Sequence, residues 1–212
     1  MKKEWKVGLA GERISIHPEW KVIDIGSGHN PFGRADVLLE RDLGESIHRS
    51  GEKAKTPSDK ILVVGDAINM PFLDKSFDYA VASHIAEHIE HIDKFIHELM
   101  RISKKGYIEV PGPLSELIFN EPYHLWIISK QGDTLVFKRK RKFKGVLSEI
   151  FYSLFYLNKE RYGHRTIFSD NFILKIVVKI LNRLWKHIPF TYIKYHWSDK
   201  IKYKIIKQKG DA

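Results

Sequence analysis

The chain has 212 residues and is 43 % hydrophobic, which suits one domain with a core and an appended segment. It contains no cysteine, which excludes disulfides, cysteine-ligated zinc, iron–sulfur clusters and a thiol nucleophile. The net charge of +10 is uneven, because residues 1–130 have 17 Lys/Arg against 20 Asp/Glu whereas residues 131–212 have 19 against 6. This basic, aromatic-rich second part indicates either an acidic partner or a lysine-rich solvated surface.

The first twenty residues carry charges throughout and have no apolar h-region, so they do not read as a signal peptide. No segment approaches the roughly 18 apolar residues of a membrane-spanning helix. The sequence therefore favours a cytoplasmic protein, with peripheral contact to a membrane as an option.

Short apolar segments that are nearly continuous rather than alternating predict strands covered on both faces, as in a parallel sheet. They are residues 21–25, 35–40, 60–67, 77–84 and 105–113. Isoleucines and a leucine at helical spacing predict an amphipathic helix over much of 85–102, with its regular part beginning near Asp93. The sequence thus predicts an α/β fold, a Rossmann-like open, mostly parallel sheet with flanking helices.

Farther along, residues 123–140 predict a β-hairpin around the turn "KQGD", and a basic run covers 138–144. Helices are predicted at 146–157 and 171–188, and an edge strand at 200–207. We expect residues 1–143 to form the α/β domain with its hairpin. Residues 144–212 would form a basic helical extension that packs on this domain and covers the substrate.

The stretch "VIDIGSGHNP" places a glycine turn directly after the first predicted strand. Glycine lets the backbone turn sharply and approach a ligand closely. A dinucleotide fingerprint would need a third glycine where Pro31 stands, and the chain has no Gly-Lys-Ser/Thr phosphate loop. These departures disfavour NAD, FAD and a P-loop nucleotide.

Taken together, "VIDIGSGHNP", "DVLLERD", "GDAINMPFLDKSFDYAVASHIAEHI" and "RISKKGYIEVP" resemble successive motifs of class I S-adenosylmethionine-dependent methyltransferases. The similarity is closest to the small-molecule branch with a "GDA…PF…SFD" block and covers about residues 20–113. It implies S-adenosylmethionine as cofactor, with Asp24 beneath its amino group or, alternatively, capping the loop. The methionine end of the cofactor would lie over Gly26, Ser27, Gly28 and His29. Asn30 stands where the family usually has a third glycine, and asparagine tolerates the same left-handed backbone.

The resemblance also assigns the rest of the cofactor. Glu40, or Asp42 as a second choice, would accept hydrogen bonds from the ribose hydroxyls, and Asp66 with Ala67 would meet the adenine. Only residues 26–34 join the first two strands, so the first helix is expected to be one turn or missing. The loop at 44–59 is a candidate to cover that side.

A histidine-rich stretch, residues 82–97, follows the fourth predicted strand. Ser83 and His84 are expected beside the sulfonium, with His84 and His88 as the catalytic candidates and His88 as the base or, alternatively, a strut for the turn. Further candidates for the base are His91, Tyr123 and His124. The string His84-x-x-Glu87-His88 resembles a zinc-hydrolase motif, but it begins at a strand end rather than on a regular helix. Without an evident carboxylate cluster we predict no metal, although Glu87 could hold magnesium.

The predicted function is methyl transfer to an oxygen or nitrogen of a small-molecule, glycan or lipid-linked acceptor. One alternative is an RNA methyltransferase that grips nucleic acid through its basic C-terminal region. Another is a non-catalytic subunit that binds S-adenosylmethionine without turnover. The string "NEPYH" at 120–124 is similar to a motif of amino-directed methyltransferases, but it is too far along the chain to serve that role.

Overall fold

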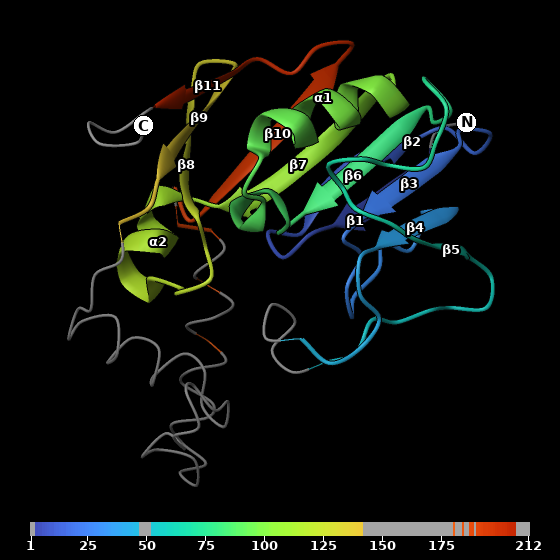
Figure 1. The fold of residues 1–212 in the computed structure, drawn as a ribbon, viewed down its shortest axis with the longest axis horizontal. Coiled ribbons are helices and arrows are strands. Elements are labelled where there is room, and N and C mark those ends of the chain that lie inside the picture. The colour runs from blue at the N-terminus through green and yellow to red at the C-terminus, as the bar shows by residue number, and fades with distance from the viewer. Residues whose placement is uncertain are drawn as a thin grey trace, which may run out of the picture.

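The computed structural model describes residues 3–46, 52–141, 180, 184, 187, 188 and 190–206. Its centre is a six-stranded sheet with strand order β10-β7-β6-β3-β4-β5 (Figure 1). The strands are β3 (Val22–Ile25), β4 (Val37–Glu40), β5 (Ile61–Val64), β6 (Tyr79–Ser83), β7 (Lys105–Pro111) and β10 (Tyr192–Ser198). Among these strands β10 alone is antiparallel to its neighbour, so the predicted mostly parallel α/β sheet is confirmed.

Two features of this sheet differ from the prediction. The strand β10 lies in the part of the chain for which we expected a helical extension, and its side chains Ile193, Tyr195 and Trp197 alternate inward in the manner of a half-buried strand. At the other edge, Ile61 and Val64 of β5 are 63 % and 60 % exposed. The expectation of cover on both faces is met only in part for this edge strand, in which Leu62 and Val63 are partly buried against the two apolar clusters.

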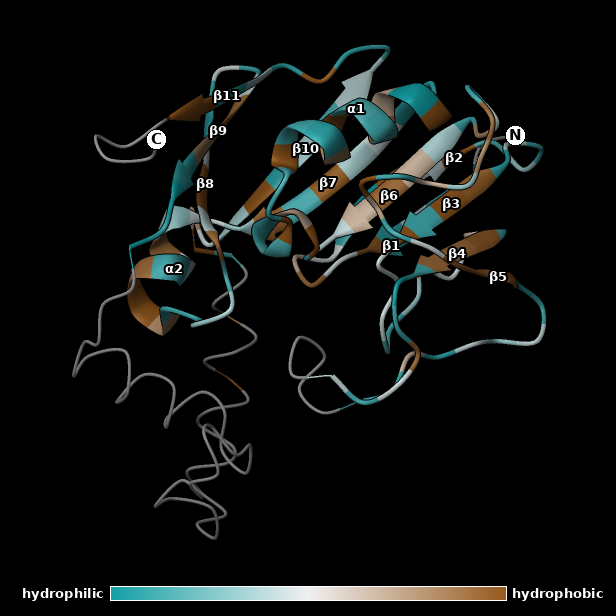
Figure 2. Ribbon diagram, viewed as in Figure 1, coloured by the Kyte–Doolittle hydropathy of each residue, from teal (hydrophilic) through white to brown (hydrophobic). Residues whose placement is uncertain are grey.

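The helix α1 (Ile92–Ile102) covers one face of the central sheet (Figure 1). Its buried side chains include Phe95, Ile96 and Leu99, while hydrophilic residues lie on its outward turns (Figure 2). The short 3₁₀ helix η2 (Ala86–His88) precedes it. This arrangement confirms the predicted apolar stripe and the start of the regular helix near residue 93.

The opposite face is covered by a β-hairpin of β1 (Lys3–Val7) and β2 (Glu12–Ile16), which the sequence analysis did not predict. Ile14 and Ile16 pack with Leu38 of the central sheet in one apolar cluster. Residues 26–36 contain no helix, as the short first crossover predicted. The hairpin thus supplies cover that a helix would otherwise give.

A second sheet has the order β11-β9-β8 and packs into the apolar core on the α1 side. It consists of β8 (Trp126–Gln131), β9 (Thr134–Arg139) and β11 (Tyr203–Ile206), which confirms the predicted hairpin and edge strand. The helix α2 (Pro113–Phe119) links β7 to this sheet. The helices predicted at 146–157 and over most of 171–188 lie outside the described residues. Among the described helices, none has the length and apolarity needed to cross a membrane.

Candidate active site

A cavity of about 1060 Å³ lies at the carboxyl ends of the central parallel strands. This is where an open α/β sheet binds its ligands. All twelve residues that the resemblance assigned to the cofactor line this one cavity, together with His88, Tyr123 and His124. His91 and His97 do not line it, and both are exposed near or on α1.

The glycine turn after β3 has a backbone that only glycine adopts without strain. Gly26 has φ of +66° and Gly28 has φ of +59°. A Cβ atom on Gly26 would lie 2.7 Å from Cδ1 of Ile85, and its backbone N–H donates to the carbonyl of Leu39 at 2.8 Å. The turn is thereby locked between two strands with its backbone facing the cavity.

Two buried carboxylates stand beneath this turn. Oε1 of Glu40 accepts hydrogen bonds from the hydroxyl of Ser27 at 3.0 Å and from the backbone N–H of Gly28. Asp24 accepts a hydrogen bond from the backbone N–H of Phe32 at 2.7 Å, which is the loop-capping role considered for it. Burial, with a contribution from the charge of Glu40, raises the pKa of Asp24 to about 7. A cation above the turn would favour the ionised form of Asp24.

Two further acids stand at the carboxyl ends of β4 and β5. Oδ1 of Asp66 accepts from the backbone N–H of Ile68 at 3.1 Å, and Ala67 beside it is buried. Asp42 is exposed and accepts from the backbone N–H of Gly44 at 2.9 Å. Glu40 is therefore enclosed by the glycine turn, whereas Asp42 faces solvent at the rim.

His84 is held in an unusual backbone conformation between two buried glutamates. Its φ is +56°, and its N–H donates to the carbonyl of Glu109 at 2.8 Å. The ring nitrogens lie 3.3 Å from Oε1 of Glu87 and 3.2 Å from Oε1 of Glu109. Burial opposes the charged form, but the two carboxylates raise the pKa of His84 to about 9. At neutral pH His84 is therefore an imidazolium.

Backbone hydrogen bonds bring a second histidine against His88. The N–H of Leu125 donates to the carbonyl of Glu87 at 2.7 Å, and the indole N–H of Trp126 donates to the carbonyl of Ile89 at 2.7 Å. These anchors place the ring of His124 with its centroid 4.8 Å from that of His88. The strand that forms the predicted hairpin thus delivers His124 to the wall of the cavity.

Sequence reasoning missed Glu109 and Glu116, both fully enclosed. Oε2 of Glu109 accepts the hydroxyl of Tyr107 at 2.6 Å, while Oε1 accepts the N–H of Ala10 from the turn of the β1–β2 hairpin at 3.0 Å. Glu116 contacts the ring of His124 and forms an ion pair with Lys140 at 2.7 Å. The only sequence signal was the presence of acids within apolar segments, which marks a buried charge that needs a partner.

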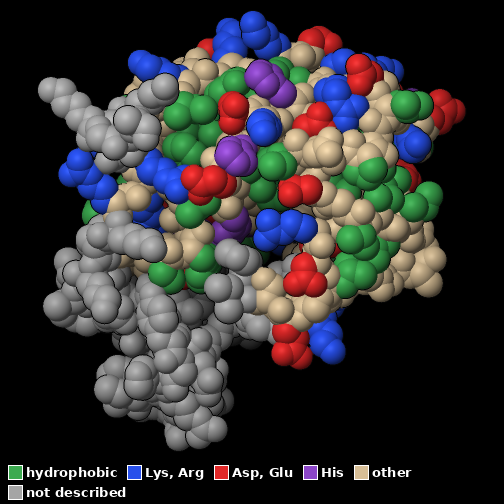
Figure 3. Space-filling model, in the orientation of Figure 1, with side chains coloured by type: hydrophobic (Ala, Val, Ile, Leu, Met, Phe, Trp, Pro, Cys, Tyr) green, Lys and Arg blue, Asp and Glu red, His purple; other side chains and the backbone are tan. Residues whose placement is uncertain are grey.

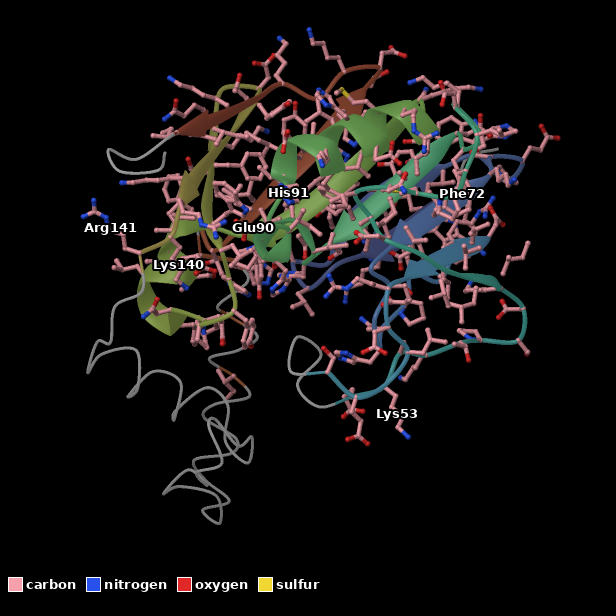
Figure 4. All side chains as sticks on the ribbon, in the orientation of Figure 1. Lys53, Phe72, Glu90, His91, Lys140 and Arg141 are labelled. Carbon is pink, nitrogen blue, oxygen red and sulfur yellow. The ribbon has the colours of Figure 1, made fainter. Side chains whose placement is uncertain are left out.

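Part of the basic run at 138–144 forms ion pairs within the chain. Lys140 is 5 % exposed and pairs with Glu116, while Arg139 pairs with Glu90 at 2.8 Å and lies over the ring of Trp126. Figure 4 shows Lys140 near α2 and Arg141 pointing away from the ribbon. On the face shown in Figure 3, the acidic and basic side chains of the described residues are interspersed.

Residues 39–108 match the family model described as a methyltransferase domain. Within this range the chain is similar to methyltransferases of class I. This match is in line with the motifs around the glycine turn, which imply S-adenosylmethionine as the cofactor.

Individual relatives of the methyltransferase domain share only part of the chain. The ubiquinone/menaquinone biosynthesis C-methyltransferase UbiE of Bordetella avium is 31 % identical over 113 residues, which are 48 % of this chain and 43 % of that protein. Ajmaline N-methyltransferase of Rauvolfia serpentina is 42 % identical over 43 residues, 20 % of this chain and 15 % of that one. The crystal structure of the PH0226 protein from Pyrococcus horikoshii is 24 % identical, with a TM-score of 0.36 over 53 % of this chain and 57 % of that chain. The chain spans less than half the length of the two curated relatives.

Proposed function

We propose that the protein transfers the methyl group of S-adenosylmethionine to an oxygen or nitrogen of a small-molecule, glycan or lipid-linked acceptor. The observation that carries this proposal is the single cavity that joins the glycine turn to the wall of His88, Tyr123 and His124. Its volume of about 1060 Å³ lies at the upper end of the usual range for small-molecule sites, which leaves room for a compact acceptor beside the cofactor.

The cofactor would occupy the half of the cavity that follows β3, β4 and β5. Its ammonium group would pair with Asp24, its ribose hydroxyls with Glu40, and its adenine with Asp66. The sulfonium would then lie toward His84, where one imidazolium stands between two carboxylates. This trio has one negative charge in excess, which favours a positively charged sulfonium nearby.

The acceptor would occupy the other half. Methyl transfer is a displacement in line with the carbon–sulfur bond, so alignment of the two reactants accounts for much of the rate. A neutral hydroxyl or amine must also lose a proton. His84 is already protonated at neutral pH, so the group that assists this loss is expected on the side of His88 and His124.

An RNA acceptor is less well supported. Arg139 and Lys140 stand in the basic run on which that alternative rested. Lys140 forms a buried ion pair with Glu116, and Arg139 forms a surface ion pair with Glu90. A grip on nucleic acid needs several cations that remain available to phosphates.

Binding of the cofactor tests the proposal directly. The unfolding temperature and calorimetric affinity would be measured with S-adenosylmethionine and its demethylated product for the wild type, Glu40→Ala and the control Asp59→Ala. Asp59 precedes β5, at the opposite end of the strands, and its side chain is 75 % exposed. We expect stabilisation of the wild type by about 2.7 kcal/mol at a hundredfold excess over Kd. Glu40→Ala should lose at least tenfold in affinity and the control should not.

The absence of any stabilisation in the wild type would remove the proposal. Once binding is established, transfer of a labelled methyl group to separated small-molecule, lipid and RNA fractions would identify the acceptor. Labelling of RNA alone, sensitive to salt, would favour the alternative.

A further inference from the structure

We infer that Glu87, His88 and His124 form a binding site for one divalent transition-metal ion, opening onto the cavity. One ligand atom from each of these side chains lies within 4.8 Å of the other two. Two imidazoles and one carboxylate are a ligand set typical of zinc and of related ions such as cobalt, iron and manganese. The sequence alone had predicted no metal, because His124 is far from the other two residues along the chain.

The strongest indication is the state of Glu87. Its side chain is 1 % exposed, and neither carboxylate oxygen makes a hydrogen bond of acceptable geometry with a group of the described residues. Nδ1 of His84 lies 3.3 Å from Oε1. A buried carboxylate without well-formed hydrogen bonds needs a further cation or donor. The two neighbouring histidines are placed to share a metal ion with Glu87.

The second indication is the support behind each imidazole. Nδ1 of His124 contacts the carboxylate of Glu116, and Nδ1 of His88 lies 3.4 Å from the carbonyl oxygen of Tyr123. A histidine that donates one ring N–H to a carboxylate or carbonyl presents its other nitrogen, Nε2, as the ligand, which is the usual second-shell arrangement of metal sites. Nε2 of His88 lies 4.0 Å from Oε1 of Glu87.

Hydrogen bonds to two backbone carbonyls also hold the site in place. The segment with His124 is tied to the segment with Glu87 and His88 by the hydrogen bonds of Leu125 and Trp126 described above. In a tetrahedral zinc site the ligand atoms lie about 3.4 Å apart, since the metal–ligand distances are about 2.0–2.2 Å. The three side chains therefore need to close by only about an ångström around the ion.

Charge favours the same conclusion. Three buried glutamates, Glu87, Glu109 and Glu116, are gathered around these histidines. The ammonium of Lys140 pairs with Glu116. A divalent ion would supply positive charge beside Glu87.

The location adds a functional consequence, which rests on the proposed function. Three protein ligands leave a coordination position open toward the cavity, as in catalytic zinc sites. A hydroxyl group bound there would lose its proton more easily, because a bound cation lowers the pKa of a ligated oxygen. The oxygen would then take the methyl group from the sulfonium sulfur, which departs as neutral thioether, and the hydroxyl proton would leave to solvent. The acceptor class is thereby narrowed to alcohols, phenols and sugar hydroxyls.

Cobalt binding tests the ion site independently of catalysis. Metal-free full-length protein would be titrated with CoCl₂ while visible absorption is recorded, and zinc would be measured by elemental analysis after equilibration and desalting. The variants are Glu87→Gln and His124→Gln, with His97→Gln as the matched control because His97 is an exposed histidine on α1. We expect one ion per chain in the wild type, at least a tenfold loss of affinity in both site variants, and less than a twofold change in the control.

Equal cobalt affinity in the wild type and His124→Gln would overturn the inference, and so would the absence of a one-to-one signal in the wild type. If Glu87→Gln does not fold, His124→Gln decides alone, since that change keeps a polar side chain beside Glu116. Thermal shift with S-adenosylmethionine on the same metal-free protein separates the two proposals. Cofactor binding without cobalt binding removes only the ion site, and cobalt binding without cofactor binding removes only the acceptor class.

Discussion

The contacts of His84 with Glu87 and Glu109 predict that the protein becomes less stable as the pH rises into the alkaline range. The pKa of His84 rises from the ordinary value of 6.5 to about 9 in the folded protein. This difference in pKa contributes on the order of 3 kcal/mol to the free energy of unfolding. Because the folded pKa is the higher one, this contribution is fully present below pH 6.5 and is lost as the pH rises through 9.

Urea unfolding between pH 6 and pH 10 would measure this contribution in the wild type and in His84→Gln. We expect the unfolding free energy of the wild type to fall by about 3 kcal/mol relative to the variant across this range. Buried tyrosines also destabilise the fold near pH 10, but they do so in both proteins, so the difference isolates His84. The exposed His97, changed to Gln, should leave the wild-type slope intact. Parallel curves for the wild type and His84→Gln would refute the reasoning, and an NMR titration of the His84 ring with a midpoint near 6.5 would do the same.

Three further outcomes are expected. Affinity for S-adenosylmethionine should rise up to about tenfold from pH 6 to pH 8 by calorimetry, because Asp24 ionises near pH 7 and then pairs with the ammonium group, and Asp24→Asn should flatten this dependence. Lys140→Met should lower the unfolding free energy by about 3 kcal/mol, since it removes the ammonium partner of the buried Glu116 carboxylate, whereas the exposed Lys138→Met should change it by less than about 0.5 kcal/mol in the same urea titration. Gly26→Ala should lower the unfolding temperature more than Gly132→Ala, because both have positive φ but only Gly26 has a neighbour in the way of a Cβ.

Sequence patterns were sufficient to predict those elements in which local propensity and burial favour the same structure. The parallel strands, the apolar stripe of α1 and the β8–β9 hairpin each follow from periodicity within a few residues. The glycine turn was also readable, because positive φ at two positions restricts the choice of residue. All the residues that the motifs assigned to the cofactor line one cavity, since parallel strands end at the same edge of a sheet.

The rest depended on contacts between distant segments. The strand β10 pairs with β7 across more than eighty residues of chain, and no element was predicted for residues 192–198 within the expected helical extension. Lys140 looked like part of a basic run for an acidic partner, yet it is enclosed with Glu116. No spacing rule connects His124 to Glu87, because their contact is created by the return of the hairpin onto η2.

One element that the sequence did not predict contributes directly to the candidate active site. The unpredicted β1–β2 hairpin covers the face left bare by the missing first helix, and its turn reaches the cavity through Gly8 and Leu9. There the N–H of Ala10 donates to Oε1 of Glu109, the same oxygen that lies 3.2 Å from His84. A Cβ on Gly8 would lie 2.3 Å from that carboxylate, so the turn must be glycine to approach it. The cover of the sheet and the charge state of His84 therefore depend on one carboxylate, and detaching the hairpin would be expected to lower the pKa of His84 as Glu109 becomes hydrated.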